Sequence, residues 1–221
     1  MGVKGGPNVD YSAAAYIFDA ANIRSYSGSA SAWYDLSGFG AACNTLTGIA
    51  FTGVGSTSYF NFLGGNSMPI TGVAHLNYGT GPRSVMSWVY PTSNAGWKQI
   101  IGFGTATGNA ATGLAISNGT KWSTYQHNTR ADEDGVAVIN VWTHVAMTQS
   151  SLGSSIFING ALAASFGSAI TANQGTAFIG AAFQDGEIWS GRIAQVLFYN
   201  RQLTAAEINK HFLITRGKFG V

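Results

Sequence analysis

Short apolar runs of strand length, separated by turn residues, recur along most of this sequence. The clearest are residues 84–90 (SVMSWVY), 98–103 (KQIIGF) and 192–199 (RIAQVLFY), each with Gly, Pro, Ser or Asn nearby. Thirty glycines against four prolines indicate many tight turns, because glycine adopts positive φ angles without steric cost. Shorter runs of the same kind are residues 16–19, 59–62, 143–147 and 177–183. The pattern predicts an all-β sandwich or barrel.

Two Asn-Gly pairs predict β-hairpins. Asn118 and Gly119 separate residues 113–117 from 121–122, and Asn159 and Gly160 separate residues 155–158 from 161–165. Asn-Gly favours the type I′ turn, in which both central residues need positive φ angles. We therefore expect antiparallel neighbours joined by type I′ turns at both places.

One short helix is expected near the end of the chain. Thr204 followed three residues later by Glu207 has the pattern of a capping box, and an apolar stripe follows it. With 221 residues the chain is long enough for one β-sandwich domain. We expect an extended N-terminal arm at residues 1–12, the sandwich at 13–215 and a frayed tail at 216–221.

The charge content argues against several partners. Charged residues make up 9% of the chain and the formal net charge is +2, without a clustered basic stripe. Nucleic-acid binding is therefore not expected, because neutralising phosphates requires such a stripe. So low a charge content implies a surface that is neutral polar or covered by neighbouring molecules, which favours an assembled or extracellular protein.

Cysteine content and hydropathy bear on the compartment. Cys43 is the only cysteine, so no intrachain disulfide is expected and its expected role is to fill the core. The N-terminal segment lacks the apolar run of a signal peptide, and no later stretch has the length of a membrane span. We expect a protein made in the cytoplasm without a signal peptide and without membrane insertion.

Several segments, taken in order, resemble a known family. Residues 33–38 (WYDLSG), 141–146 (VWTHVA), 156–160 (IFING) and 199–208 (YNRQLTAAEI) resemble successive motifs of the laminin-G-like domains found in tailed-phage virion proteins. These domains are concanavalin A-like lectin sandwiches. The resemblance implies a two-sheet antiparallel jelly roll with one short C-terminal helix. It departs from the family pattern at Phe39, Ala41 and Leu63, where the family often carries Asn, Asn and Asp.

The resemblance also implies a function. It implies a non-catalytic structural protein located in the virion, as a capsid decoration, head-fibre or tail-adhesin component. Its partners would be copies of itself and other virion proteins. A carbohydrate-binding lectin that recognises host surface glycans is the alternative, and the two roles are compatible.

A glycoside hydrolase is the least favoured reading of the sequence. Such an enzyme needs two carboxylates flanking the scissile bond. The chain lacks the Glu-x-Asp-x-x-Glu string of sandwich glycosidases, and its two closely spaced acidic pairs, Asp132/Asp134 and Asp185/Glu187, lie in glycine-containing segments that favour turns. No catalytic residue is predicted. Asp132, Glu133 and Asp134 remain candidates for a calcium loop, since calcium prefers oxygen ligands; no other cofactor is expected.

Aromatic residues are the candidates for ligand contact. Trp97, Trp122, Tyr125 and Trp189 fall in or near expected turns, where their rings can stack on a sugar or contact another subunit. The remaining tryptophans considered, which lie in the family motifs, are expected to be core or loop anchors: Trp33, Trp88 and Trp142. His144 lies in an apolar strand, and a hydrogen-bonded structural role is expected for it.

Overall fold

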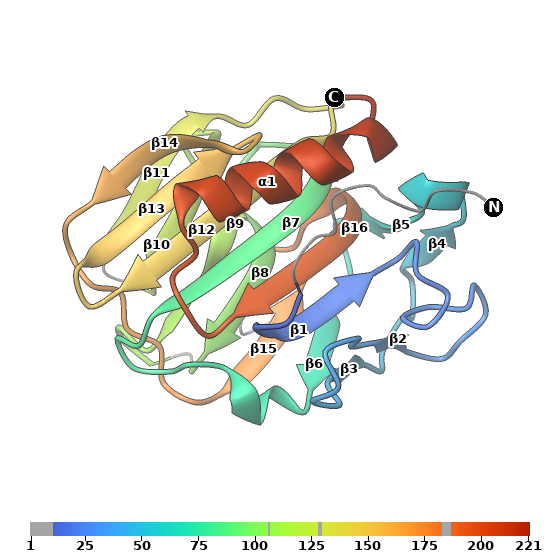
Figure 1. Cartoon of the computed structure of the whole chain (residues 1–221), viewed down its shortest axis with the longest axis horizontal. Helices are drawn as coiled ribbons and strands as arrows, with labels where there is room; N and C mark the ends of the chain where they lie inside the picture. Colours follow the sequence, from blue (N-terminus) through green and yellow to red (C-terminus); the bar gives the residue numbers. More distant parts are fainter. Residues whose placement is uncertain (1–10, 106, 128–129, 183–186) are drawn as a thin grey trace.

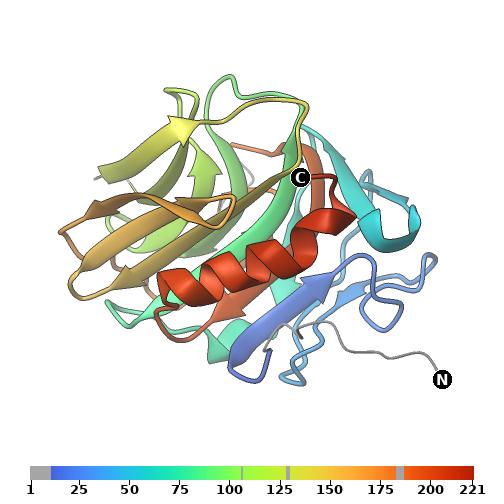
Figure 2. The same cartoon turned by 45° about the horizontal axis from the view of Figure 1, so that its top comes forward.

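The computed structural model of the chain describes residues 11–105, 107–127, 130–182 and 187–221. They form two antiparallel sheets of eight strands each, with one α-helix on the outside of one sheet (Figures 1 and 2). The expected all-β, two-sheet sandwich with a short C-terminal helix is therefore confirmed. No helix within the described ranges is long and apolar enough to cross a membrane.

Sheet A carries the helix. Its spatial order is β14 (Ala161–Phe166), β13 (Gly153–Ile158), β12 (Thr143–Ser150), β7 (Arg83–Pro91), β16 (Ser190–Tyr199), β5 (Tyr59–Leu63) and β4 (Ala50–Thr52), and β1 (Ala14–Asp19) also pairs with β16. The helix α1 (Ala205–Thr215) crosses this sheet, as Figure 1 shows, and the 3-10 turn η3 (Arg216–Lys218) follows it.

Sheet B forms the other layer. Its spatial order is β11 (Arg130–Val136), β10 (Lys121–Gln126), β9 (Ala111–Ile116), β8 (Lys98–Gly104), β15 (Thr176–Ile179), β6 (Met68–Thr71), β3 (Ala42–Cys43) and β2 (Trp33–Tyr34). Two further 3-10 turns, η1 (Gly55–Thr57) and η2 (Val73–His75), lie in loops. Thus β11 and β14 are terminal strands of their sheets.

The main core lies between the two sheets and is rich in aromatic rings. Its fully buried members include Trp33, Phe60 and Trp122, and Trp33 packs edge-on against Phe18 at 5.5 Å between ring centroids. Cys43 is buried in the same cluster, as expected. Burial of large rings contributes much of the stabilising apolar area in a fold of this kind.

Segment 33–38, one of the family motifs, fixes a long loop to the first strand. The Asp35 carboxylate accepts hydrogen bonds from the backbone nitrogens of Ile17, at 2.8 Å, and Ser37, at 2.9 Å. The same carboxylate accepts the Ser37 hydroxyl. The acidic residue of this motif therefore satisfies backbone donors, which is a structural role.

The helix α1 covers the outer face of sheet A through a second apolar layer. Ile208 packs with Met86 and Phe157, and Phe212 stacks on Trp88 with ring centroids 5.9 Å apart. The predicted capping box is present, because Thr204 and Glu207 exchange side-chain to backbone hydrogen bonds.

His144 of β12 contacts His211 of α1 across this layer. Their Nε2 and Nδ1 atoms lie 3.0 Å apart, and both rings are buried. The hydrogen-bonded structural role expected for His144 is confirmed. The pair ties the helix to the centre of sheet A.

One of the two predicted type I′ turns is correct. Asn159 and Gly160 have φ angles of 48° and 77°, as the type I′ turn requires. The hairpin predicted at Asn118-Gly119 is present, since β9 and β10 pair antiparallel, but its turn is not type I′, because the positive φ angle, 62°, falls at Thr120. There the Thr120 nitrogen donates to the Ser117 carbonyl and the loop is longer than two residues, so a left-handed residue closes it.

Five strands were not predicted from the sequence, and the prediction of a frayed tail at residues 216–221 is wrong. The strands β2, β3, β4 and β6 are two to four residues long, too short for a clear alternation pattern. The fifth, β11, was interpreted as a turn because of its acidic residues and Gly135. Residues 216–221 were expected to fray, whereas Phe219 stacks on Trp88 at 4.2 Å between centroids. The expected arm lies mostly outside the described residues, since the description begins at residue 11.

Candidate functional site

A groove of about 520 Å³ opens at one end of the sandwich. It lies where the connection between β11 and β12 passes the chain segment after η3, and Figures 1 and 2 show these two segments side by side near the C-terminus. Strand β7 contributes Tyr90, and the β13–β14 hairpin contributes Ile158 and Asn159. The remaining lining residues are Trp122, Val136, Val138, Asn140, Val141, Trp142, Thr143, Phe219, Gly220 and Val221.

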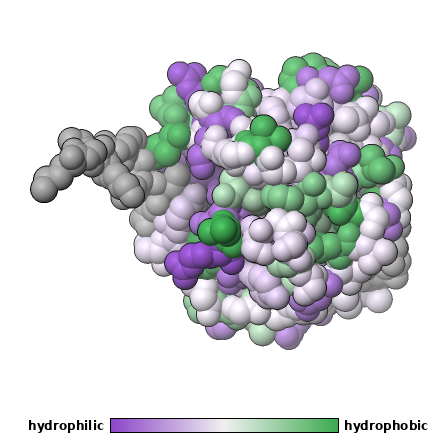
Figure 3. Space-filling view, turned by 90° about the vertical axis from the view of Figure 1, so that its right-hand side faces the viewer, coloured by the Kyte–Doolittle hydropathy of each residue, from purple (hydrophilic) through white to green (hydrophobic). Residues whose placement is uncertain are grey.

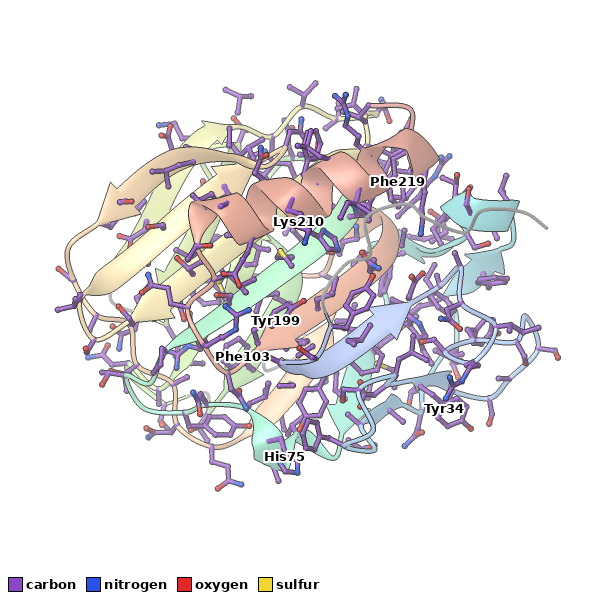
Figure 4. All side chains as sticks on the ribbon, in the orientation of Figure 1. Tyr34, His75, Phe103, Tyr199, Lys210 and Phe219 are labelled. Carbon is purple, nitrogen blue, oxygen red and sulfur yellow. The ribbon has the colours of Figure 1, made fainter. Side chains whose placement is uncertain are left out.

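The ring of Trp142 lies at the centre of an aromatic cluster in this groove. Its centroid is 5.6 Å from that of Tyr90, 5.8 Å from Tyr59 and 4.9 Å from Phe219. All four rings are half-buried, so each keeps part of a face or edge open. Figure 4 shows Phe219 beside the C-terminal end of α1.

A cation adjoins the cluster. The Arg192 guanidinium lies 4.4 Å from the ring centroid of Tyr90 and 4.7 Å from that of Tyr59. The strand register explains this position, because Arg192 of β16 is the direct partner of Tyr90 in β7 and of Asn61 in β5. Cation–π contact at both rings fixes the guanidinium between them.

Hydrogen bonds hold the walls of the groove in place. The Asn140 nitrogen donates to the Pro91 carbonyl at 2.8 Å, and Asn94 Nδ2 donates to the Ala137 carbonyl at 2.8 Å. On the opposite wall, the His144 nitrogen donates to Asn159 Oδ1 at 3.0 Å. The groove is therefore built on anchored backbone, as a preformed binding site requires.

The chemistry of the lining is apolar and neutral. Val136 and Val138 are 63% and 55% exposed and form an aliphatic rim, while Asn140, Thr143 and Asn159 supply amide and hydroxyl groups. The lining includes no Asp, Glu, Lys, Arg or His among the described residues. Such a surface suits a neutral ligand with apolar faces and hydroxyl groups.

The predicted ligand residues do not form one site. Trp122 is 1% exposed in strand β10, where it packs in the main core and borders the groove from inside. Trp189 is fully buried in the same core. Tyr125 and Trp97 pack together on sheet B, with centroids 5.8 Å apart, where Tyr125 is buried and Trp97 half-buried. Trp122 and Tyr125 both belong to strand β10, which follows the turn at Asn118-Gly119.

The three metal candidates also diverge. They lie in strand β11, so side chains alternate between faces, and Glu133 points away from Asp132 and Asp134. Asp132 is buried and accepts the Ser154 hydroxyl, while Glu133 accepts the Ser117 hydroxyl at 2.8 Å. Asp134 accepts the Gly135 nitrogen at 2.6 Å. The described parts of the chain contain no group of three or more His, Cys, Asp or Glu side chains placed to share a metal ion.

The second acidic pair lies partly outside the described residues. Asp185 belongs to the undescribed segment 183–186. Glu187 accepts a hydrogen bond from Gln99 Nε2 at 2.6 Å. Glu187 precedes β16, whereas Asp132 and Asp134 lie on β11, where a turn was expected.

Sequence reasoning missed the groove residues that matter most. Trp142 was assigned to the core or a loop anchor, Phe219 to a frayed tail, and Tyr90 only to a strand. A usable signal was present in the apolar run Val138, Ile139 and Val141, which sits between strands where a loop should be polar. The four rings of the cluster come from four separate segments of the chain, so only the folded topology brings them together.

Solved structures share the fold at low sequence identity. Domain 4 of AbnA, a GH43 extracellular arabinanase from Geobacillus stearothermophilus solved with arabinotriose, gives a TM-score of 0.69 at 16% identity, covering 89% of this chain and 97% of that one. A Trypanosoma rangeli sialidase gives 0.68 at 17% identity over 99% of this chain. The binding domain of botulinum neurotoxin serotype G gives 0.65 at 18% identity, covering 91% of this chain and 51% of that one.

These likenesses show the fold alone. The chain spans only 35% of the length of the sialidase. A search among curated proteins found no match. A family model of the laminin G type, described as the concanavalin A-like lectin/glucanases superfamily, matches residues 62–209, which is more than half of the chain. Together with the two-sheet sandwich, this match shows that the chain belongs to the concanavalin A-like lectin/glucanase superfamily.

Proposed function

We propose that this chain is a non-catalytic structural component of a virion that binds neutral carbohydrate in the aromatic groove. The observation that carries the proposal is the uncharged groove of about 520 Å³ around Trp142. Capsid decoration, head fibre and tail adhesin are the structural roles that fit a module of this kind.

Carbohydrate suits the groove because a sugar presents both apolar C–H faces and hydroxyl groups. The rings of Tyr90, Trp142 and Phe219 provide apolar faces, and Asn140 and Thr143 provide hydrogen-bonding groups. The arabinanase domain that shares the fold was solved with arabinotriose. That likeness supports a sugar ligand here. The aromatic rings and polar groups of the groove are the reason for placing the sugar there.

The absence of catalysis is supported by how the carboxylates are used. Outside the undescribed segments, each acidic side chain has a partner within the fold: Asp19 with Gln195, Asp35 with Ser37, Asp132 with Ser154, Glu133 with Ser117, Asp134 with Gly135, Glu187 with Gln99, and Glu207 with Arg201. None of them lines the groove. A glycosidase needs two carboxylates on either side of one bond, and the groove offers none.

The virion role rests on the ordered motifs that resemble phage laminin-G-like domains, together with the character of the surface. Figure 3 shows one face on which hydrophobic and hydrophilic residues are interspersed, with a green stretch across its middle. Exposed Ile23 and Leu63, each 76% accessible, add apolar surface that neighbours can cover. In this proposal the partners are copies of this chain, other virion proteins and host surface glycans. The protein is made in the host cytoplasm and located in the particle.

A glycan array with purified protein tests the groove. Binding to neutral glycans, equal with calcium and with a chelator, is expected. Blank arrays under both conditions would remove the carbohydrate part of the proposal, and binding that depends on calcium would move the site away from the groove.

Co-sedimentation with purified virions, followed by mass spectrometry of the particles, tests the structural role. The chain should be present in particles at a fixed stoichiometry, and added protein should bind particles that lack it. Absence from particles together with no affinity for them would overturn the virion assignment.

A further inference from the structure

Residues 135–184 contain no Asp, Glu, Lys or Arg. They are fifty consecutive residues out of 221, so all 20 charged residues lie in the rest of the chain. The stretch includes all of β12, β13 and β14. Strand β14, the terminal strand of sheet A, is therefore uncharged, and so is the strand next to it.

The terminal strand of sheet B has a different composition. Strand β11 carries Asp132, Glu133 and Asp134, and it ends beside Gly135, which has a φ angle of 64°. A bulge interrupts its pairing with β10 between Lys121 and Trp122. Charges, bulges and inward-pointing acids are the devices that keep an edge strand from pairing with another chain.

Strand β14 has one of these devices and lacks the others. Its pairing with β13 contains a bulge at Ala163, since Leu162 and Ala164 face consecutive residues of β13. The strand has no charged residue and no proline. Within the described residues, its backbone pairs with β13 alone, so its outer edge presents unpaired N–H and C=O groups.

The side chains along this edge are small or apolar and open to solvent. Ala161, Leu162 and Ser165 are exposed, with Leu162 at 54%. Figures 1 and 2 both show β14 at the border of the molecule. Another β-strand can form hydrogen bonds with the unpaired backbone groups of an edge strand, and an uncharged edge places no like charges between two copies.

We propose that β14 pairs antiparallel with β14 of a second copy of this chain, about a two-fold axis. Self-pairing of β11 would oppose like charges, because Asp132 of one copy would approach Asp134 of the other. Self-pairing of β14 opposes only Ala, Leu, Ser and Phe side chains. A two-fold arrangement uses the same patch on both copies and closes the edge that each copy leaves open.

This inference rests on the assembly part of the proposed function and names the surface for it. It is independent of the groove, since Leu162 does not line it. Loss of dimers and loss of glycan binding are therefore separate results.

Analytical ultracentrifugation of wild type and of Leu162→Lys tests the proposal. Wild type should form a dimer, and the two lysines brought together at the edge should raise its dissociation constant by at least about tenfold. Val54→Lys is the matched control, because Val54 is 55% exposed and follows β4, which lies at the opposite end of the sheet A order from β14. It should dimerise like wild type.

A monomeric wild type at every concentration tested would overturn the proposal, and so would equal dimerisation of both lysine variants. Circular dichroism shows whether Leu162→Lys is folded. Should it not fold, Ala161→Lys at the start of the same strand replaces it. Virion binding that persists while wild type stays monomeric would leave the proposed function standing and reject the β14 surface alone.

Discussion

Strand β11 and the aromatic groove meet at Val136, yet their chemistry is used in opposite ways. The carboxylates of Asp132, Glu133 and Asp134 each accept a hydrogen bond inside the fold. The rings of Tyr90 and Trp142 line the groove and are only half-buried, so part of each ring is open to a ligand.

The difference teaches where binding capacity lies in a chain with few charges. Charged side chains are rare here, and the described carboxylates serve as caps, turn partners and inter-strand ties. Aromatic and amide groups are abundant, and a surplus of them stays at the surface after the core is filled. We therefore expect stability to depend on the acidic strand and the buried rings, and ligand affinity to depend on the groove.

The largest loss of stability is expected when Trp189, a buried ring that was predicted to bind ligand, is replaced. Trp189→Ala empties a fully buried site in the main core, and such substitutions cost about 3–5 kcal/mol. Urea unfolding should show this loss, while the folded fraction keeps its glycan affinity. A stability close to wild type would mean that Trp189 is not a core residue and would return it to the ligand candidates.

Acid should destabilise the contact between α1 and sheet A. Burial, and to a smaller extent the charge of Lys218, lowers the pKa of His211 from 6.5 to about 4. Burial and the neighbouring His211 hold the pKa of His144 well below its ordinary value. The unfolded chain takes up protons below pH 6.5 that the folded chain does not, so stability is lost as the pH falls.

The expected slope is about 1.4 kcal/mol per pH unit for each histidine between pH 6 and pH 4. Urea unfolding at a series of pH values measures it. His211→Gln removes one of the two groups and should show roughly half the wild-type slope. A flat profile in wild type over this range would contradict the buried neutral pair.

A smaller loss of stability is expected from substitutions in the acidic strand β11. Asp132→Ala leaves the buried Ser154 hydroxyl without its acceptor, which should cost about 1–3 kcal/mol. Glu133→Ala is the neighbouring control, since Glu133 is half-exposed and should cost less. Neither variant should change glycan affinity. If calcium raises the melting temperature of wild type but not of Asp132→Ala, strand β11 binds metal, which would contradict a purely structural role for its carboxylates.

The smallest effect is expected at the border of the groove. Arg192→Ala removes the guanidinium between Tyr59 and Tyr90, a contact worth about 0.5–1 kcal/mol at an exposed site. Glycan affinity should fall a few-fold because the Tyr90 ring loses its support. Arg192→Lys, which keeps the charge, should recover part of the loss. An unchanged affinity would show that the ligand does not depend on Tyr90.

Much of the sandwich was predictable from local pattern, and the groove was not. Strands β7, β8 and β16 are long and apolar, and Thr204 with Glu207 gives a local helix start, so each carries its own signal. Strand β11 was not predicted, because its three acidic residues and Gly135 form a local pattern that is typical of a turn. Trp142 and Phe219 lie 77 positions apart in the sequence, and their meeting depends on the path of α1 across sheet A.

The most direct test of the central claim compares two tryptophans by calorimetric titration with a neutral glycan found on the array. Trp142→Ala should weaken binding by about tenfold or more, since stacked rings at a binding site contribute on this scale. Trp97→Ala, on sheet B, should bind like wild type, and a calcium chelator should change nothing. Full affinity in Trp142→Ala together with a loss in Trp97→Ala would contradict the account and place the site on sheet B.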